Sequence, residues 1–205
     1  MYHFSAISPR ALELLKTIVE IPDVSDFYLV GGTALALNCG HRLSIDLDFF
    51  TSKEFDTNFL KASLSESFSI TVLSQAKNSL TVEIDSVKTD FIRHNYPLIK
   101  PLVSDEGIRM ASVEDIAAMK LNSTMNRGAK KDFFDIDELL NLFSIEQLLS
   151  FHSKKYAFSE QLILLKSLVF FDDAENEPDP VSLRTISWDS VKQKISNEVT
   201  SFIGL

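Results

Sequence analysis

The chain has 205 residues, of which 45% are hydrophobic and 24% charged, a balance typical of globular proteins. Its formal net charge of −9 excludes a protein whose whole surface grips nucleic acid, so any such contact must come from a local basic patch. With no apolar run near the ~20 residues of a membrane span, no secretory signal and Cys39 as the only cysteine, the sequence predicts a cytoplasmic protein without membrane contact or intrachain disulfide.

The first elements in chain order lead to a glycine pair. Ser8 and the proline after it predict the start of a helix, because serine caps helices and proline suits the first helical position. Residues 27–30 form a short apolar run that stops at Gly31-Gly32, which predicts a buried strand and a turn. A short helix is expected over residues 33–38, ended by Gly40. The glycines free the backbone to approach a ligand, and the helix offers its N–H groups to phosphate.

An alternating acidic segment follows the glycine turn. Residues 45–49 predict a strand with Ile45, Leu47 and Phe49 on one face and Asp46 and Asp48 on the other. A structural strand gains nothing from two neighbouring carboxylates, whereas Mg²⁺ is commonly held by one or two carboxylates plus substrate phosphates. The alternative is an exposed acidic strand after an ordinary turn. The glycine turn at this distance favours a phosphate cradle beside a metal site.

These motifs, GGTALAL and GHRLSIDLDFF, resemble the nucleotidyltransferase superfamily that includes DNA polymerase β. They are more similar to its AbiEii/AbiGii branch, whose members are toxins of bacterial toxin–antitoxin and phage-defence systems. The resemblance implies that Asp46 and Asp48 bind the metal. His41 also matches the branch pattern, and Arg42 is expected either to contact phosphate or to be a solvated charge. The nucleotide-binding residues implied in this part of the chain are Gly31, Gly32, Thr33, Arg42 and Ser44.

The next segment predicts one helix and three strands. Asp56 is expected to cap a helix over residues 57–67, with Phe59, Leu60 and Leu64 facing inward. The β-branched content of residues 68–73 predicts a strand. Two further strands, 80–84 and 87–92, are joined across Asp85-Ser86, a hairpin-length loop. Residues 94–104 are expected to form a loop, and 108–111 an edge strand.

One acidic residue lies inside the second hairpin strand. Lys88, Asp90 and Ile92 share one face of that strand by alternation. The superfamily takes its third metal-binding carboxylate from a later strand, and Asp90 matches that position. Glu83 and Asp85 are the competing candidates, and we favour Asp90.

Composition shifts towards helix after residue 108. We expect a nucleotidyltransferase α/β core over residues 1–108 and a helical region over 109–205 packed on that core. Ser112 predicts a helix cap, the helix spans 116–126 and Gly128 ends it. Another helix is expected over 129–141. Ser144 and Ser159 are expected to cap later helices, of which the one after Ser159 should be buried, and a last helix should span 188–202. The aromatic residues expected in the core are Phe151, Phe158, Phe170, Phe171 and Trp188.

The helical region carries a second set of charged residues. Lys120 and Arg127 lie a heptad apart, so both can point to one side of a helix and neutralise charge on the leaving pyrophosphate. Asp132 and Asp135 share a helix face and are expected to orient those cations or to contact the nucleotide. The alternative is a solvated face with salt bridges. The segment DIAAMKLNSTMNRGAKKDFFDIDELL also resembles the branch, and the residues that match its pattern are Lys120, Arg127, Lys131, Asp132 and Asp135.

We therefore predict an α+β nucleotidyltransferase fold, a small mixed sheet flanked by helices and followed by a helical half. The expected enzyme uses Mg²⁺, with Mn²⁺ as an alternative, to move a nucleoside monophosphate from an NTP to an acceptor. The resemblance to the toxin branch implies that the acceptor is RNA, at the 3′ end of tRNA. The local basic cluster expected to steer RNA is formed by Arg127, Lys130 and Lys131. An antitoxin encoded nearby is an expected partner. The alternatives are an inactive nucleotide-binding protein that acts through a partner and a small-molecule nucleotidyltransferase of the antibiotic-modifying kind. The catalytic residues expected are Asp46, Asp48, Asp90 and Lys120.

Overall fold

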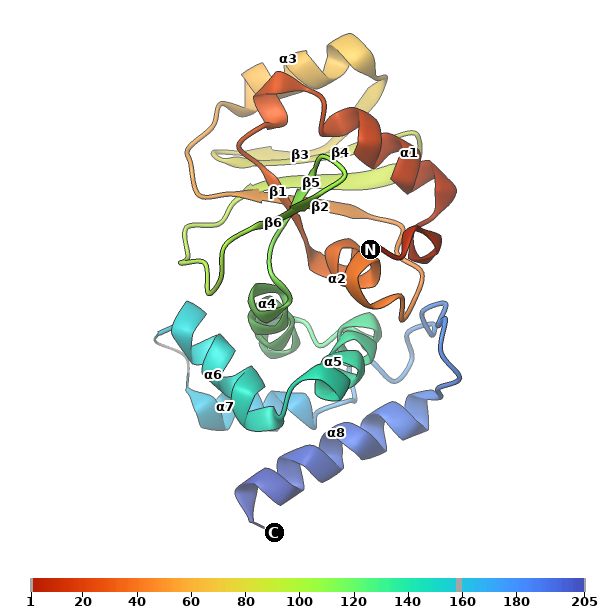
Figure 1. Cartoon of the computed structure of the whole chain (residues 1–205), viewed down its shortest axis with the longest axis vertical. Coiled ribbons are helices and arrows are strands. Elements are labelled where there is room, and N and C mark those ends of the chain that lie inside the picture. The colour runs from red at the N-terminus through yellow and green to blue at the C-terminus, as the bar shows by residue number, and fades with distance from the viewer. Residues whose placement is uncertain (1, 158–159, 205) are drawn as a thin grey trace. The chain divides into compact units, whose positions relative to one another are not determined.

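The computed structural model describes residues 2–157 and 160–204, coloured along the chain in Figure 1. The chain divides into two compact units, and the division does not follow a single cut in the sequence. Unit 1 comprises Met1–Gly40, Ser44–Tyr96 and Pro101–Ala111, whereas unit 2 comprises His41–Leu43, Pro97–Lys100 and Ser112–Leu205.

Unit 1 is built on a seven-stranded mixed sheet with the order β3-β4-β5-β2-β1-β7-β6. The pairs β2–β5 and β1–β7 are parallel, and the other neighbours are antiparallel. The strands are β1 (Tyr28–Val30), β2 (Leu47–Thr51), β3 (Ile70–Ala76), β4 (Ser79–Ile84), β5 (Val87–Arg93), β6 (Val103–Asp105) and β7 (Ile108–Met110). The helical elements of unit 1 are η1 (Phe4–Ala6), α1 (Pro9–Ile18), η2 (Pro22–Val24), α2 (Gly31–Cys39) and α3 (Thr57–Ser67). This mixed sheet with helices confirms the predicted α+β class.

Local sequence signals set several of these boundaries. The Ser8 hydroxyl accepts a hydrogen bond from the N–H of Ala11 and caps α1 as predicted. Gly40 ends α2 in the left-handed conformation, with φ +62°, which glycine adopts without a steric cost. Asp85 and Ser86 both have positive φ, so they form the tight turn expected between β4 and β5.

Three expectations for unit 1 were wrong. Ile45 is 59% exposed, because the chain before β2 pairs at Ser44 with the segment around Ile7 and joins the sheet only from Leu47. Phe59 is 64% exposed, since it lies about 100° round α3 from the buried Leu60. The segment expected as a loop over 94–104 ends in β6, so β6 and not β7 is the edge strand.

Unit 2 is helical. Its helices are α4 (Val113–Asn126), α5 (Lys130–Leu142), α6 (Ile145–Lys155), α7 (Gln161–Leu168) and α8 (Trp188–Ile203). Helix α4 packs against α5, α6 and α7, and α8 covers the same three neighbours of α4. The caps predicted at Ser112 and Ser144 are present, and the latter forms a capping box with Gln147. No helix among residues 2–157 and 160–204 is long and apolar enough to cross a membrane.

The helix α7 differs from expectation because it is amphipathic. Leu164, Leu165 and Leu168 are buried, whereas Leu162 and Ile163 are exposed, so only one side of the helix faces the core. Phe170, just after the helix, is also exposed, against the expectation of a core residue. The cap expected at Ser159 and the core position expected for Phe158 lie outside the described residues.

Candidate functional site

The predicted acidic residues of unit 1 are brought together by strand pairing. Strands β2 and β5 run parallel in a register that makes Asp48 and Asp90 direct neighbours. Neighbouring residues in register point to the same face of a sheet, so these two carboxylates lie side by side. Asp46 precedes β2 by one residue and is half-buried. We call Asp46, Asp48 and Asp90 the carboxylate cluster.

The two glycines, expected as a turn before a helix over 33–38, are instead the first residues of α2, which starts beside this cluster. Val30 is the cross-strand partner of Asp48, so the residue after it, Gly31, starts α2 beside the same carboxylate. Gly31 has φ +69°, and a Cβ placed on it would lie 2.3 Å from Oδ2 of Asp48. Both the backbone conformation and the contact therefore demand glycine at this position.

Alanine substitutions at Gly31 and Gly107 should distinguish the effect of a clash with Asp48 from the effect of backbone strain. Gly31→Ala is expected to displace the Asp48 carboxylate and to lower the nucleotidyl transfer that the sequence motifs imply by about 10²-fold, since small displacements in an active site cost that much. The matched control is Gly107→Ala, because Gly107 also has positive φ, of +78°, but a Cβ there would meet nothing within 4 Å. Steady-state transfer rates and thermal melting of both variants would test this. Equal activity losses in the two variants would contradict the clash.

Asp90 is held by two side chains of unit 1. The Thr81 hydroxyl donates to Oδ1 at 2.6 Å, and the Lys88 ammonium donates to Oδ2 at 2.7 Å. Burial lowers the pKa of Lys88, but the hydrogen bond to Asp90 and the charges of Asp90, Asp48 and Asp46 outweigh it, and the pKa is raised. The three carboxylates of the cluster therefore act on a single ammonium group. Alternation along β5 predicts that Lys88 lies on the face of Asp90, but alternation does not predict this contact.

The competing carboxylates are placed differently. Glu83 lies opposite Lys88 in the register of β4 and β5 and is exposed, and Asp85 is exposed in the turn. Asp90 is the one of the three that is the register partner of Asp48. This placement favours Asp90 as the third carboxylate, which stays a prediction.

The donor set suits a hard cation that shares its ligands with a substrate. No three His, Cys, Asp or Glu side chains in the described part of the chain are gathered as a preformed metal site. Mg²⁺ takes oxygen ligands and is usually bound by one or two carboxylates plus phosphates of the substrate. The oxygen donors of Asp46 and Asp48 fit this chemistry.

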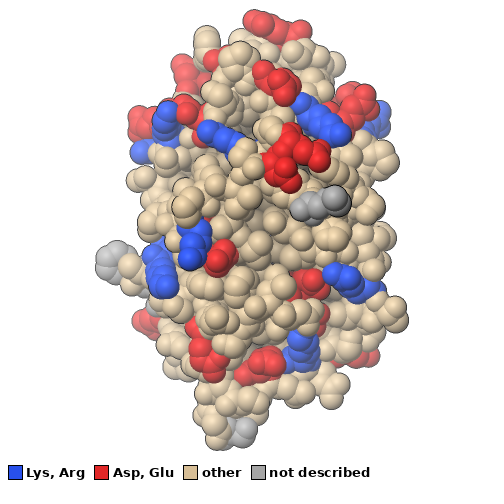
Figure 2. Space-filling view, in the orientation of Figure 1, with Lys and Arg blue, Asp and Glu red and all other residues tan. Residues whose placement is uncertain are grey.

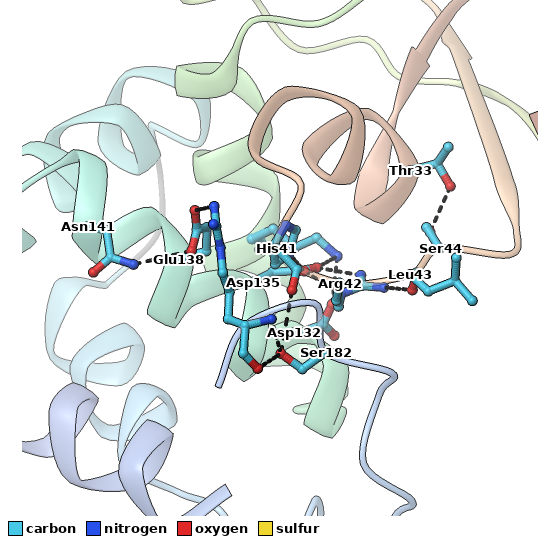
Figure 3. A network of polar contacts seen from close by, with 12 residues as sticks. Thr33, His41, Arg42, Leu43, Ser44, Asp132, Asp135, Glu138, Asn141 and Ser182 are labelled. Carbon is cyan, nitrogen blue, oxygen red and sulfur yellow. Dashed lines mark hydrogen bonds and ion pairs between the residues drawn. The ribbon is translucent and has the colours of Figure 1, made fainter. Parts of the chain in front are cut away.

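Two hydroxyl residues expected at the phosphates are engaged inside unit 1. Thr33 donates to Oγ of Ser44 at 2.8 Å (Figure 3). The Thr33 hydroxyl also contacts the carbonyl oxygen of Asp46. Thr33 and Ser44 are both buried. These contacts tie the start of α2 to the segment that leads into β2, so the two side chains position Asp46.

Unit 2 contains a buried ion network centred on Asp135. Arg42 donates to both carboxylate oxygens of Asp135, through Nε at 2.6 Å and Nη2 at 2.9 Å. Lys120 Nζ lies 2.7 Å from Oδ2 of Asp135. His41 Nε2 lies 2.7 Å from Oδ1 of Asp135 (Figure 3). Arg42 is buried, so the alternative of a solvated charge is wrong. Burial raises the pKa of Asp135, but the charges of Lys120 and Arg42 outweigh it and hold that pKa well below its ordinary value.

Asp132 joins the two cations expected to act on the triphosphate. It accepts from Lys120 Nζ at 3.0 Å and from Arg127 Nε at 2.9 Å and Nη2 at 3.1 Å. Burial lowers the pKa of Lys120, but the charges of Asp135 and Asp132 raise it overall, so Lys120 is an ammonium ion. Both aspartates are fully buried, which makes a solvated helix face wrong. Their contacts orient the cations, and the Arg127 side chain remains 55% exposed.

Lys130 is not part of a basic surface, contrary to expectation. It is buried and donates to the carbonyl oxygens of Glu175 and Glu177 and, at 3.1 Å, to Oδ1 of Asp179. Its ammonium also lies 5.2 Å from the ring centroid of Trp188. Residues 172–180, DDAENEPDP, form an acidic loop that thus neutralises Lys130 by a long-range contact. The adjacent Lys131 is exposed.

The sequence matches, over residues 13–99 and 67–202, the family described as nucleotidyl transferase AbiEii toxin of type IV toxin–antitoxin systems. The chain belongs to this family. It is a nucleotidyltransferase, and the resemblance seen in the sequence motifs is confirmed. An uncharacterized protein of Aquifex aeolicus (strain VF5) is 37% identical over 171 residues, which cover 80% of this chain and 83% of that protein.

Solved structures share the fold of this AbiEii-family member. A putative nucleotidyltransferase from H. pylori has a TM-score of 0.61 at 18% identity, covering 95% of each chain. MenT4, a nucleotidyltransferase toxin from Mycobacterium tuberculosis H37Rv, has a TM-score of 0.60 at 14% identity, covering 97% of this chain and 86% of that one. At these identities the likeness concerns the fold, and it confirms the predicted nucleotidyltransferase architecture with a helical C-terminal half.

Proposed function

We propose that this nucleotidyltransferase moves a nucleoside monophosphate from an NTP, with Mg²⁺ or Mn²⁺, to the 3′ end of tRNA, and that this transfer is a toxin activity controlled by an antitoxin encoded nearby. The observation that carries the metal-dependent reaction is the register that sets Asp48 beside Asp90, with Gly31 closing on Asp48. Family membership supports the toxin assignment.

The residues have separate tasks in this reaction. A metal bound by Asp46 and Asp48 would polarise the phosphate oxygens and supply charge stabilisation. The N–H groups at the start of α2, from Gly31 onward, bind phosphate as helix N-termini do. Lys120 and Arg127, oriented by Asp132 and Asp135, neutralise the charge that develops on pyrophosphate.

The proposed transfer makes one bond and breaks one bond at the α-phosphorus of the NTP, and it releases pyrophosphate, which can be measured. The acceptor hydroxyl attacks the α-phosphorus, the bond to the bridging α–β oxygen breaks and pyrophosphate leaves with that oxygen. The proton of the hydroxyl passes to a carboxylate of the cluster, for which Asp90 is our candidate. One pyrophosphate is therefore released for each nucleotide transferred.

The test is transfer of label from each α-³²P-labelled NTP, with Mg²⁺, to total RNA or to total protein. We expect label in the tRNA fraction, removable with the 3′-terminal nucleotide, and none with the Asp48→Asn variant. Label in protein or in a small molecule would contradict RNA as the acceptor and would still support the transfer reaction. Metal-dependent NTP binding without pyrophosphate release would instead support an inactive nucleotide-binding protein.

A local cation should steer the acidic protein to RNA. Basic and acidic side chains are interspersed on the face shown in Figure 2, so a single large basic surface does not carry the contact there. Lys131, exposed next to Asp132, is our candidate for a phosphate contact. Lys131→Ala should weaken RNA binding and lower the slope of log affinity against log salt by about 1.

The control for this prediction is Lys154→Ala, which removes an exposed lysine from α6 in the same unit. RNA affinity at several salt concentrations and NTP affinity are measured for both variants, since Lys131 also matches the nucleotide-binding pattern. An unchanged salt slope in Lys131→Ala would remove Lys131 from the RNA contact. Lys130 is unsuitable for this test because its charge reversal would disrupt buried contacts.

A further inference from the structure

The carboxylate cluster already contains a cation supplied by the chain. Lys88 lies two residues before Asp90 on β5, and its ammonium donates to Oδ2 of Asp90 at 2.7 Å. Asp90 is the register neighbour of Asp48, and the charges of Asp48 and Asp46 also act on Lys88. The Lys88 ammonium therefore stands where the summed field of three carboxylates favours positive charge.

Lys88 pairs with Asp90 although another carboxylate, that of Glu83, is also nearby. Glu83 lies directly opposite Lys88 across β4 and β5, yet the ammonium bonds to Asp90 on its own strand. Thr81 holds the other oxygen of Asp90 at 2.6 Å, so the carboxylate is fixed from two sides. The Lys88 side chain is 49% exposed, which leaves it free to move away when another cation arrives.

We propose that Lys88 is a built-in counter-ion of the carboxylate cluster, which competes with the divalent metal for Asp90 and keeps metal affinity low until nucleotide binds. This inference rests on the proposed metal-dependent function and assigns to Lys88 a positioning role within it. A bound triphosphate adds negative charge and further oxygen ligands, so metal and nucleotide together can displace an ammonium that the metal alone displaces poorly.

The experiment measures metal binding without turnover. Mn²⁺ is titrated into the nucleotide-free protein, and free Mn²⁺ is followed by electron paramagnetic resonance. Lys88→Met should bind Mn²⁺ about tenfold more tightly than the wild type, as expected when one positive charge is removed from the neighbourhood of a divalent ion in a solvated site. Thr81 still fixes Asp90 in this variant, and the half-exposed position of Lys88 makes unfolding unexpected.

Two control variants isolate the effect. Lys88→Arg keeps the positive charge and should resemble the wild type. Lys53→Met removes an exposed charge of the same unit, paired with Asp26 at 2.7 Å, and should also leave Mn²⁺ affinity unchanged. With a non-hydrolysable NTP analogue, the Mn²⁺ affinities of the wild type and Lys88→Met should differ less. The reason is that nucleotide and metal together displace the Lys88 ammonium of the wild type.

Each outcome decides between the claims. Tighter Mn²⁺ binding in Lys88→Met alone supports the counter-ion. Mn²⁺ binding that is lost in Asp48→Asn but unchanged or weakened in Lys88→Met overturns the counter-ion and leaves the proposed function intact. If Mn²⁺ binds to no variant, with or without the NTP analogue, the metal-dependent function and the counter-ion are both overturned.

Discussion

Asp48→Asn is expected to lower nucleotidyl transfer by at least about 10³-fold, because charge stabilisation by a bound metal contributes several kcal/mol to the transition state. Asn keeps the size of the side chain and loses the charge that binds a cation. The fold should persist, since the change relieves repulsion between Asp48 and its register neighbour Asp90. Label transfer from α-³²P-NTP measures the activity, and far-UV circular dichroism with thermal melting checks the fold.

Four further variants of unit 1 accompany this test. Asp46→Asn and Asp90→Ala should be comparably damaging, because both remove a member of the carboxylate cluster. Asp85→Ala, in the exposed turn between β4 and β5, and Glu83→Ala should be mild. Near-wild-type transfer by Asp48→Asn would contradict the assignment of Asp48 as a metal ligand. An essential Glu83 together with a dispensable Asp90 would show that the third carboxylate comes from β4.

Asp135→Asn is expected to destabilise unit 2 by about 3–5 kcal/mol, as breaking a buried ion pair from one side does. Asp135 is fully buried, and its carboxylate faces Arg42 and Lys120, so the variant removes a negative charge that compensates both buried cations. Trp188 is the only tryptophan of the chain and belongs to unit 2, so its fluorescence during urea unfolding reports on that unit.

The matched control lies two residues further along α5. Burial raises the pKa of Asp137 and outweighs the lowering by Lys194, so ionised Asp137 is less favourable in the folded state than in the unfolded one. The pKa of Asp135 is shifted the opposite way. Asp137→Asn should therefore change the unfolding free energy little near neutral pH. Equal destabilisation by both variants would contradict a special role for the ion network at Asp135.

Acidification should lower the stability contributed by Asp135 and should not do so for Asp137. The folded-state pKa of Asp135 is depressed, so its contribution to stability is complete above the ordinary aspartate pKa and is lost as pH falls through the lowered value. Asp137 has a raised pKa, so its protonation on acidification does not oppose folding in the same way. The stability difference between wild type and Asp135→Asn should shrink as the solution is acidified.

Short-range patterns in the sequence determined much of unit 1. The cap at Ser8 and the turn at Asp85-Ser86 depend on local conformations that these residue types favour, and each appears where the pattern predicts it. The turn expected at Gly31-Gly32 is instead the start of α2, which begins at Gly31 and not at Thr33. Alternation placed Asp90 on one face of its strand. Family motifs added the expected order of site residues, and the chain proved to belong to the AbiEii family.

Tertiary contacts decided the partners of those residues. Alternation cannot show that β2 and β5 are parallel neighbours, so it could not pair Asp48 with Asp90 or give Lys88 its position among the carboxylates. Lys130 and Lys131 are adjacent lysines that the sequence placed in one basic cluster, yet Lys130 is buried against the acidic loop over residues 172–180 and Lys131 is exposed.

The same distinction explains Arg42. The sequence by itself determined that a charged residue lies between the glycine turn and the acidic strand. Only the fold decided that its partner is Asp135, which is 93 residues away along the chain. The physical reason is that burying a guanidinium is unfavourable without a carboxylate to compensate its charge, and where that carboxylate lies depends on long-range packing.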